Sequence, residues 1–288
     1  MELKTIKEQM RREHRQLKIR KFIRNRALMI GAVVTVLMIL LAALSRGIAP
    51  YDPLEIDVTK RLMPPCGAYV FGTDTFGRDV LSRILYGTAI SMKTGLVVSV
   101  TSFVIGLVMG LYSGYYPRLG AVLMRLCDGL KAIPSLILAI ALVGVMGAGM
   151  RNVILTLSII SIPDIARVAR SLTLQVKEQT YIEALRASGA GSMRIIWLNI
   201  MPNVISTVLV QVSFIFATAV ISEASLSFLG VGIPVPEPSW GNIINEGKTV
   251  IFQAWWMVVY PGIFIAASVL GLNLLGEGLR DFLDPLTN

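Results

Sequence analysis

The sequence predicts an all-α, polytopic membrane protein with six transmembrane helices. Its 288 residues are 54% apolar and 16% charged, with a mean hydropathy of +0.68. Soluble domains average about 45–50% apolar and about 25% charged residues. Apolar runs of a length that spans about 30 Å of hydrocarbon recur along the chain. Residues 1–26 carry ten Lys or Arg against three Glu, which supplies seven of the net +9 charges. These observations indicate one membrane domain and not a soluble enzyme.

The basic arm, residues 1–26, is predicted to be cytoplasmic because Lys and Arg concentrate on the cytoplasmic flank of a first membrane helix. Binding to nucleic acid is the less favoured interpretation, and no nucleic acid partner is expected. The apolar residues Leu3, Ile6, Met10 and Leu17 fall near one helical face, which would suit the inner leaflet or a partner. Residues 27–45 follow without a charge and are expected to form a retained first transmembrane helix, since the run exceeds the apolar core of a signal peptide.

An extracytoplasmic segment, residues 46–88, is expected next, followed by a membrane core of five spans in residues 89–288. The five apolar spans lie near residues 90–113, 121–146, 153–168, 204–228 and 255–275. Alternate crossings then place 46–88, 147–152 and 230–254 outside and 115–118, 169–201 and the C-terminus inside. From Arg167 to Arg194 there are five basic residues against two Glu, whereas 230–254 holds one Lys against two Glu. This bias fits the positive-inside rule and predicts a bacterial or archaeal cytoplasmic (inner) membrane protein with both termini cytoplasmic.

Small residues mark the faces through which the second span should pack. Gly87, Ser91, Gly95 and Ser99 recur every four residues, and Gly106, Gly110 and Gly114 continue the spacing. Such faces allow helix backbones to approach closely in a bilayer. They predict tight packing, either inside the subunit or between subunits.

Charges inside predicted spans are the first candidates for function because burying them in lipid is costly. Glu223, near the outer end of the fifth span, and Asp164, which follows Pro163 at a predicted break in the fourth, are candidate residues of a translocation path or gate. Arg125, Asp128 and Lys131 are spaced for pairing along one helix face and are interpreted as structural. Trp240, Trp255 and Trp256 are expected to form an interfacial belt.

Catalytic and cofactor sites are not expected in this chain. His14 is the single histidine, which excludes His-based metal sites and a Ser-His-Asp triad. Cys66 and Cys127 fall on opposite sides of the predicted bilayer, so no disulfide is expected. Residues 241–249 have five residues between their glycines where a phosphate-binding loop has four, and no strand precedes them. We therefore predict no nucleotide or metal site and no enzymatic residues.

The inner segment 170–202 contains the strongest local signal. Its residues 181–202 predict a helix that ends at Gly189, then a second helix that begins at Ser192 as N-cap and stops before Pro202. Two short helices would form a compact cytoplasmic projection suited to docking in another protein's cleft. Its outward charges are expected to be Glu183, Arg186 and Arg194, and its outward apolar residues Leu185, Ile195 and Trp197.

Glu183-Ala184, Gly189 and Ile200-Met201-Pro202 resemble the EAA motif of ABC-importer permeases, with Leu185 and Met201 as apolar departures from its usual residues. Much of the remaining chain resembles the second permease of the dipeptide/oligopeptide/nickel class. The motifs are Phe71-Gly72-Thr73-Asp74, Gly77 to Arg83, Ile133-Pro134-Ser135, Glu223 to Gly230, Pro238 to Gly241, Gly278 to Asp281 and Asp284-Pro285.

The resemblance implies the fold of a type I ABC importer permease and a role as the membrane subunit of an ATP-driven importer. It implies a second similar permease, two ABC ATPase subunits that hold the ATP and Mg, and an extracytoplasmic substrate-binding protein. Within the inner segment it assigns ATPase coupling to Glu183, Ala184, Arg186, Gly189, Arg194, Ile200 and Pro202.

The substrates that the resemblance allows are di- and oligopeptides, nickel or metal chelates and other peptide-like compounds. An ATP-independent secondary transporter is the alternative, although no ladder of carboxylates crosses the predicted bilayer. A membrane-anchored receptor is a third hypothesis, for which six spans are more than an anchor needs.

Overall fold

The computed structural model describes residues 25–283 of the chain. Most of the basic arm and the motif residues Asp284 and Pro285 lie outside this range. Every regular element within the described range is a helix, as the sequence predicts.

The long elements, in chain order, are α2 (Arg26–Ile48), α3 (Val80–Tyr115), α4 (Pro117–Lys131), α5 (Ser135–Met146), α6 (Met150–Lys177), α9 (Met201–Phe228) and α11 (Trp256–Leu283). Shorter elements are η1 (Val58–Lys60), α7 (Thr180–Ala187), α8 (Ser192–Arg194), the π-helix η2 (Ile195–Ile200), α10 (Trp240–Gly247) and η3 (Lys248–Val250). Five stretches are long and apolar enough to cross a membrane, and α4 with α5 makes a sixth if that bent pair is one span.

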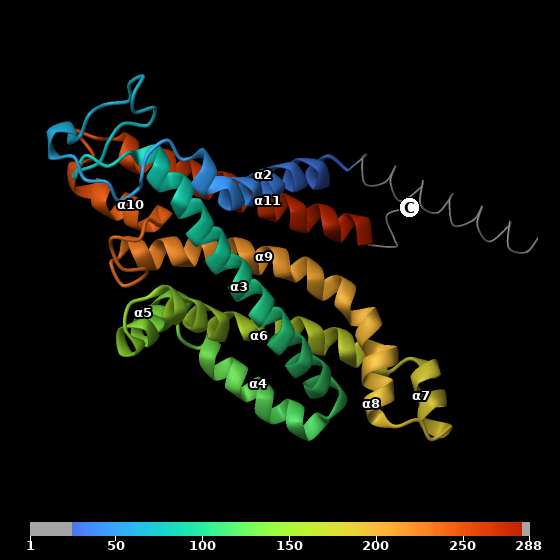
Figure 1. The fold of residues 1–288 in the computed structure, drawn as a ribbon. Helices are drawn as coiled ribbons and strands as arrows, with labels where there is room; N and C mark the ends of the chain where they lie inside the picture. The colour runs from blue at the N-terminus through green and yellow to red at the C-terminus, as the bar shows by residue number, and fades with distance from the viewer. Residues whose placement is uncertain (1–24, 284–288) are drawn as a thin grey trace, which may run out of the picture.

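Helix α3 crosses the bundle diagonally (Figure 1) and packs against most of the other long helices. Helices α2 and α11 lie side by side on one flank of it, and α4 and α6 lie on the other. Helix α9 lies between these two groups and contacts α3, α6 and α11. At about 1.5 Å per residue the 36 residues of α3 extend about 54 Å, well beyond the hydrocarbon thickness. One helix therefore links the two ends of the molecule.

The predicted outer segments share one end of the bundle and the predicted inner segments share the other. At the outer end, Gly149 N donates to Gly232 O at 3.2 Å, and Arg78 pairs with Glu246. At the opposite end, Lys177 Nζ donates to Tyr115 O at 2.9 Å. Figure 1 shows this separation, with α10 at one end and α7 and α8 at the other.

The expected single helix over residues 121–146 is wrong. This stretch instead belongs to two helices, α4 and α5, which meet at an angle of 91°. The break comes at Pro134, which has no N–H to donate and disfavours helical backbone at Ile133. Helix α5 is consequently only 12 residues long, and Ile137 and Val145 on it are 60% and 89% exposed.

Proline 163 does not break its helix, contrary to expectation. Helix α6 continues through it from Met150 to Lys177, longer at both ends than the predicted span. The next span also begins early, because the helical stretch that ends at Phe228 starts at Ser192. The inner segment is therefore shorter than its sequence pattern indicated.

The small-residue faces of α3 are filled by neighbouring helices of the same chain. A β-carbon at Gly106, Gly110 or Gly114 would lie 2.6, 2.3 or 2.6 Å from a side-chain atom of α6. A β-carbon at Gly95 would lie 2.6 Å from the Phe216 ring of α9. These glycines thus serve packing within the subunit, which is one of the two interpretations that the spacing allowed.

The expected tryptophan belt is mostly wrong. Trp240 is fully buried beside Gly87, and Trp256 is 4% exposed and donates its Nε1–H to Thr73 O at 3.0 Å. Only Trp255, at 48% exposure, is placed as a belt residue would be. The two cysteines are free, as expected.

We predict that Gly110→Ala destabilises the bundle, because the added methyl group would lie 2.3 Å from Ala169 Cβ and force α3 away from α6. Overpacking of this kind costs about 1–3 kcal/mol. Gly129→Ala is the matched control, since it lies within α4 with no atom within 4 Å of the new β-carbon. Thermal unfolding in detergent should show a lower midpoint for the first variant and an unchanged or slightly higher one for the second. Equal midpoints would contradict the packing role of Gly110.

Candidate functional site

The first candidate site is the projection formed by residues 180–200, which we call the α7–α8 segment. Gly189 ends α7 as expected, with a positive φ of +82°. Its N–H donates to Arg186 O at 2.9 Å, and the N–H of Ala190 donates to Leu185 O at 3.0 Å. These two bonds form a Schellman motif, which satisfies the last carbonyls of α7 and turns the chain sharply.

The second helix of the segment differs from the prediction at both ends. Gly191 is the N-cap, and Ser192 is the first helical residue. The helix does not stop before Pro202 but continues through η2 into α9, with Met201 N bonded to Ile196 O. A π-turn of this kind shifts the hydrogen-bond register, and Pro202 then stands in the first turn of α9 where its missing donor is tolerated. The projection is thus continuous with a membrane span.

Four isoleucines anchor the segment to the bundle. Ile182, Ile195, Ile196 and Ile200 are each fully buried, in one cluster with Leu107 and Leu111 of α3. The expectation that Ile195 points outward is therefore wrong, and Leu185 and Trp197 are also partly covered by this cluster. Ile200, which the resemblance assigned to coupling, lies inside the fold.

The outer surface of the segment is mixed in character. The exposed members of the predicted set are Glu183, Ala184, Arg186, Gly189, Arg194 and Pro202. The apolar side chains beside them are Met193 and Leu198, which are 60% and 67% exposed and were not predicted. Charged and apolar groups on one small surface are typical of a protein interface.

Tyr115, at the end of α3, joins the segment to the bundle. Arg186 Cζ and Lys177 Nζ lie 5.2 and 5.5 Å from the centre of its ring, and its hydroxyl is 3.3 Å from Ser192 Oγ. One side chain therefore contacts α6, α7 and α8. Sequence reasoning missed Tyr115, because only the fold brings these helices to it.

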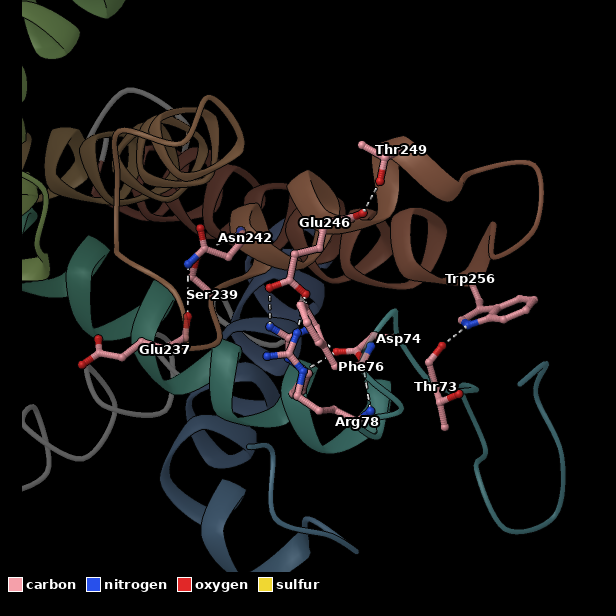
Figure 2. Close-up of polar contacts among 11 residues, drawn as sticks. Thr73, Asp74, Phe76, Arg78, Glu237, Ser239, Asn242, Glu246, Thr249 and Trp256 are labelled. Carbon is pink, nitrogen blue, oxygen red and sulfur yellow. Dashed lines mark hydrogen bonds and ion pairs between the residues drawn. The ribbon is translucent and has the colours of Figure 1, made fainter. Parts of the chain in front are cut away.

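The opposite end of the molecule contains a buried ion network (Figure 2). Arg83 is fully buried and pairs with Asp74 and Glu246 at 2.5 Å each. Arg78, only 3% exposed, pairs with the same two carboxylates at 2.6 and 2.7 Å. Four charges from the 49–79 segment, α3 and α10 thus neutralise one another. Buried charges are tolerated when they are paired in this way.

Backbone geometry holds the network in place. Gly72 and Gly77 have positive φ values of +74° and +79°, and a β-carbon at Gly77 would lie 1.8 Å from Asp57 O. Asp74 Oδ1 also accepts from the N–H groups of Phe76 and Arg78. The Gly72 to Arg83 motifs therefore build a structural connection. The signal of this network in the sequence was the equal number of acidic and basic side chains in residues 46–88. The spacing of these residues did not show which of them pair.

Glu223 is fully buried between α9 and α3. It accepts hydrogen bonds from Ser91 Oγ at 2.6 Å and from Ser227 Oγ at 2.8 Å. Ser227 Oγ in turn accepts from Ile233 N, so the carboxyl group also fixes the loop after α9.

Asp164 lies on α6 and pairs with Lys131 at 2.7 Å, beside the break between α4 and α5. Asp128 pairs with Arg167, also at 2.7 Å. The expected pairing along one face of the third span is therefore wrong, because Asp128 and Lys131 each pair with a residue of α6. Asp164 is part of a partly exposed pair, whereas Glu223 has no exposed surface in this chain.

Metal ligation has no geometric support in the described range. Among residues 25–283, no group of three or more His, Cys, Asp or Glu side chains is arranged to hold a metal ion. Residues 241–249, the discarded phosphate-loop pattern, form α10 and η3 instead of a loop after a strand.

We predict that Glu246→Ala destabilises the outer end, since it leaves Arg78 and Arg83 with one shared carboxylate. Removing one partner from a buried ion network costs about 3–5 kcal/mol. Glu237→Ala removes an exposed carboxylate from the same end and should change stability by less than about 0.5 kcal/mol. The stability of the two variants is measured by thermal unfolding and by the rate of proteolysis within the 49–79 segment. Equal protease resistance of the two variants would contradict a stabilising network.

Comparison with known proteins gives two family matches. Residues 102–288 match the family described as the binding-protein-dependent transport system inner membrane component. Residues 15–65 match the N-terminal transmembrane domain of oligopeptide transport permease C.

Several named relatives cover nearly the whole chain. A Brucella abortus protein named as a peptide transport system permease is 41% identical over 93% of this chain and 91% of its own. The di/tripeptide transport system permease DppC of Pseudomonas aeruginosa is 37% identical over 92% and 89%. The glutathione transport system permease GsiD of Pectobacterium atrosepticum is 39% identical over 92% and 89%.

A similar fold occurs in a solved structure of the MetNI methionine ABC transporter in inward-facing conformations. One chain of it superposes with a TM-score of 0.56 at 20% identity, over 70% of this chain and 97% of that one. This likeness concerns the fold.

Proposed function

The chain belongs to the binding-protein-dependent transport system inner membrane components, and on that basis we propose that it conducts di- and oligopeptides as one permease of an ATP-driven importer. The observation that carries the substrate class is the match over about nine-tenths of the chain to permeases named for peptide, di/tripeptide and glutathione transport. Nickel and metal chelates have less support, because none of these three names refers to a metal.

The partners we propose are a second, similar permease, two ABC ATPase subunits that bind ATP and Mg, and an extracytoplasmic substrate-binding protein. The family description itself includes dependence on a binding protein. The half-covered helix α5, with its exposed Ile137 and Val145, is a suitable surface for the second permease. In this proposal the chain supplies the path, and ATP hydrolysis belongs to the ATPase subunits.

The proposed orientation follows the charge bias and the segregation of loops. The basic arm, the α7–α8 segment and the C-terminus face the cytoplasm, and segment 46–88 faces outward. The five spans of residues 89–288 then form the permeation core, with 170–202 as its coupling loop. This arrangement is supported by the clustering of the alternate loops at opposite ends of the bundle.

The coupling mechanism that we propose begins at the exposed face of the α7–α8 segment. Glu183, Ala184, Arg186, Gly189, Arg194 and Pro202 supply this face, and Ile200 anchors it from inside. When the ATPases close, the segment moves with them, and the movement passes through η2 to α9 and through Tyr115 to α3. The nucleotide then shifts the balance between two arrangements of the spans.

We propose different roles for the two candidate path residues, Asp164 and Glu223. Asp164 and Lys131 form a partly exposed pair at the α4–α5 break, which can open or close as α5 moves. Glu223 holds α3 to α9 while the spans move, through its bonds to Ser91 and Ser227.

The proposal is tested by gentle extraction of the tagged chain, identification of the co-purified subunits and assay of the complex in proteoliposomes. We expect ATP-dependent dipeptide uptake, with a second permease and ATPase subunits in the complex. The variant Glu183→Lys should assemble in the membrane but lose most uptake per ATP hydrolysed, because it reverses a charge on the docking face. Glu237→Lys, with the same charge change at the other end, should retain coupling.

Uptake without ATP, or recovery of the chain without any ATPase subunit, would favour a secondary transporter. Normal coupling in Glu183→Lys would refute the docking role of the α7–α8 segment.

A second pair of variants tests the shape of the segment. Gly189→Ala places a side chain at φ +82°, which costs about 1–2 kcal/mol, whereas Gly191 has φ −65° and open space around it. We expect Gly189→Ala to lower the ratio of peptide imported to ATP hydrolysed and Gly191→Ala to leave it unchanged. Equal ratios in the two variants would show that the Schellman turn does not contribute to coupling.

A further inference from the structure

A small cavity of about 70 Å³ lies in the outer segment. None of its lining residues belongs to the ion network or to the α7–α8 segment. Its lining residues are Tyr51, Asp52, Glu55, Asp57, Lys60, Tyr69, Gly77 and Asp79. Tyr51, Asp52 and Glu55 are exposed, so the mouth faces solvent. The volume is sufficient for one ammonium group, since a cavity needs about 10–15 Å³ of such space to hold a water molecule.

The cavity carries an excess of negative charge. Four carboxylates line it against one lysine. Asp79 is 3% exposed, and its Oδ2 accepts from Ser82 N and Ser82 Oγ, but its Oδ1 is buried without a hydrogen-bond partner. A carboxylate oxygen that lacks a donor behind the cavity wall adds to the negative potential of the cavity, which favours a cationic group there.

Several observations select the kind of cation. The described residues contain no group of three carboxylates that converges on a metal-sized point. The cavity instead combines carboxylates with the rings of Tyr51 and Tyr69, whose centres are 5.1 Å apart. Carboxylates beside aromatic faces suit an organic ammonium group, which takes one ion pair and a cation–π contact.

Lys60 shows how such a group is held here. Its Nζ lies 2.8 Å from Asp57 Oδ2 and 5.8 Å from the centre of the Tyr69 ring. Hydrogen bonds from Lys60 and Thr59 lower the pKa of Asp57 to about 2, so this carboxylate stays charged at physiological pH. Since Lys60 neutralises one carboxylate, Asp52, Glu55 and Asp79 are left to interact with a second ammonium group.

We propose that this cavity receives a lysine side chain of the extracytoplasmic substrate-binding protein. The inference rests on the proposed function, which places segment 46–88 outside and supplies that partner. The partner's lysine enters beside Tyr51, its ammonium group pairs with the exposed carboxylates of Asp52 and Glu55, and the buried charge of Asp79 lies behind them. The cavity thereby gives the docked protein a fixed point next to the buried network that joins the outer segment to α3.

The test uses the intact complex in lipid nanodiscs and the substrate-binding protein recovered with it. A carbodiimide joins carboxylates directly to contacting amines, and mass spectrometry then locates the new amide bonds. We expect a bond between Asp52 or Glu55 and one lysine of the binding protein. Glu55→Lys should weaken binding by about tenfold or more, since juxtaposed like charges are strongly unfavourable at an interface.

Glu237→Lys is the matched control, because it makes the same charge change on an exposed residue of the outer end that does not line the cavity. It should alter binding by less than about twofold, as an exposed charge away from the contact does. Changing the identified lysine of the partner to Glu should restore binding to the Glu55→Lys complex.

Cross-links confined to Lys60 of the same chain, or equal binding by Glu55→Lys and Glu237→Lys, would overturn the inference. These results leave the proposed function intact if the complex still contains its ATPase subunits and imports dipeptide. Loss of the ATPase subunits from the wild-type preparation would instead refute the proposed function itself.

Discussion

Helix α3 approaches α6 and α9 so closely that β-carbons at its glycines would overlap their atoms. Helices inside a bilayer gain little hydrophobic stabilisation by leaving lipid for each other, so they associate through close van der Waals contact and hydrogen bonds. The contact depends on Gly95, Gly106, Gly110 and Gly114, which allow one straight helix to touch two partners. Because α3 is the common partner, the positions of the outer network and of Tyr115 both depend on this packing.

The two ends of α3 use charge in opposite ways. At the outer end, Arg83 and its partners are buried and mutually paired, which fixes the 49–79 segment and α10 to the bundle. At the other end, Glu183 and Arg194 remain exposed over an underside of buried isoleucines. The first arrangement makes a rigid platform, and the second leaves charged groups available to another protein. The two ends of the molecule therefore present different kinds of surface.

The bend between α4 and α5 separates a half-covered short helix from the rest of the bundle. The ion pairs Lys131–Asp164 and Asp128–Arg167 join α4 to α6 next to that bend. Helix α5 itself packs mainly on α6 and, to a smaller extent, on α9. The fold therefore combines a tightly packed group around α3 with one lightly held element, which is the arrangement expected where a path opens and closes.

The sequence alone determined the fold class, five of the six predicted spans and the Gly189 turn, because hydropathy over about 20 residues and a glycine after a helix are local signals. It also located the projection formed by the α7–α8 segment. Only the tertiary structure decided which side chains face outward, since Ile195 and Trp240 are buried by helices far away in sequence. The same holds for the pairing of Asp74 with Arg83, of Lys131 with Asp164 and of Glu223 with Ser91. An ion pair between distant segments depends on their approach in space, and neither spacing nor composition encodes that approach directly.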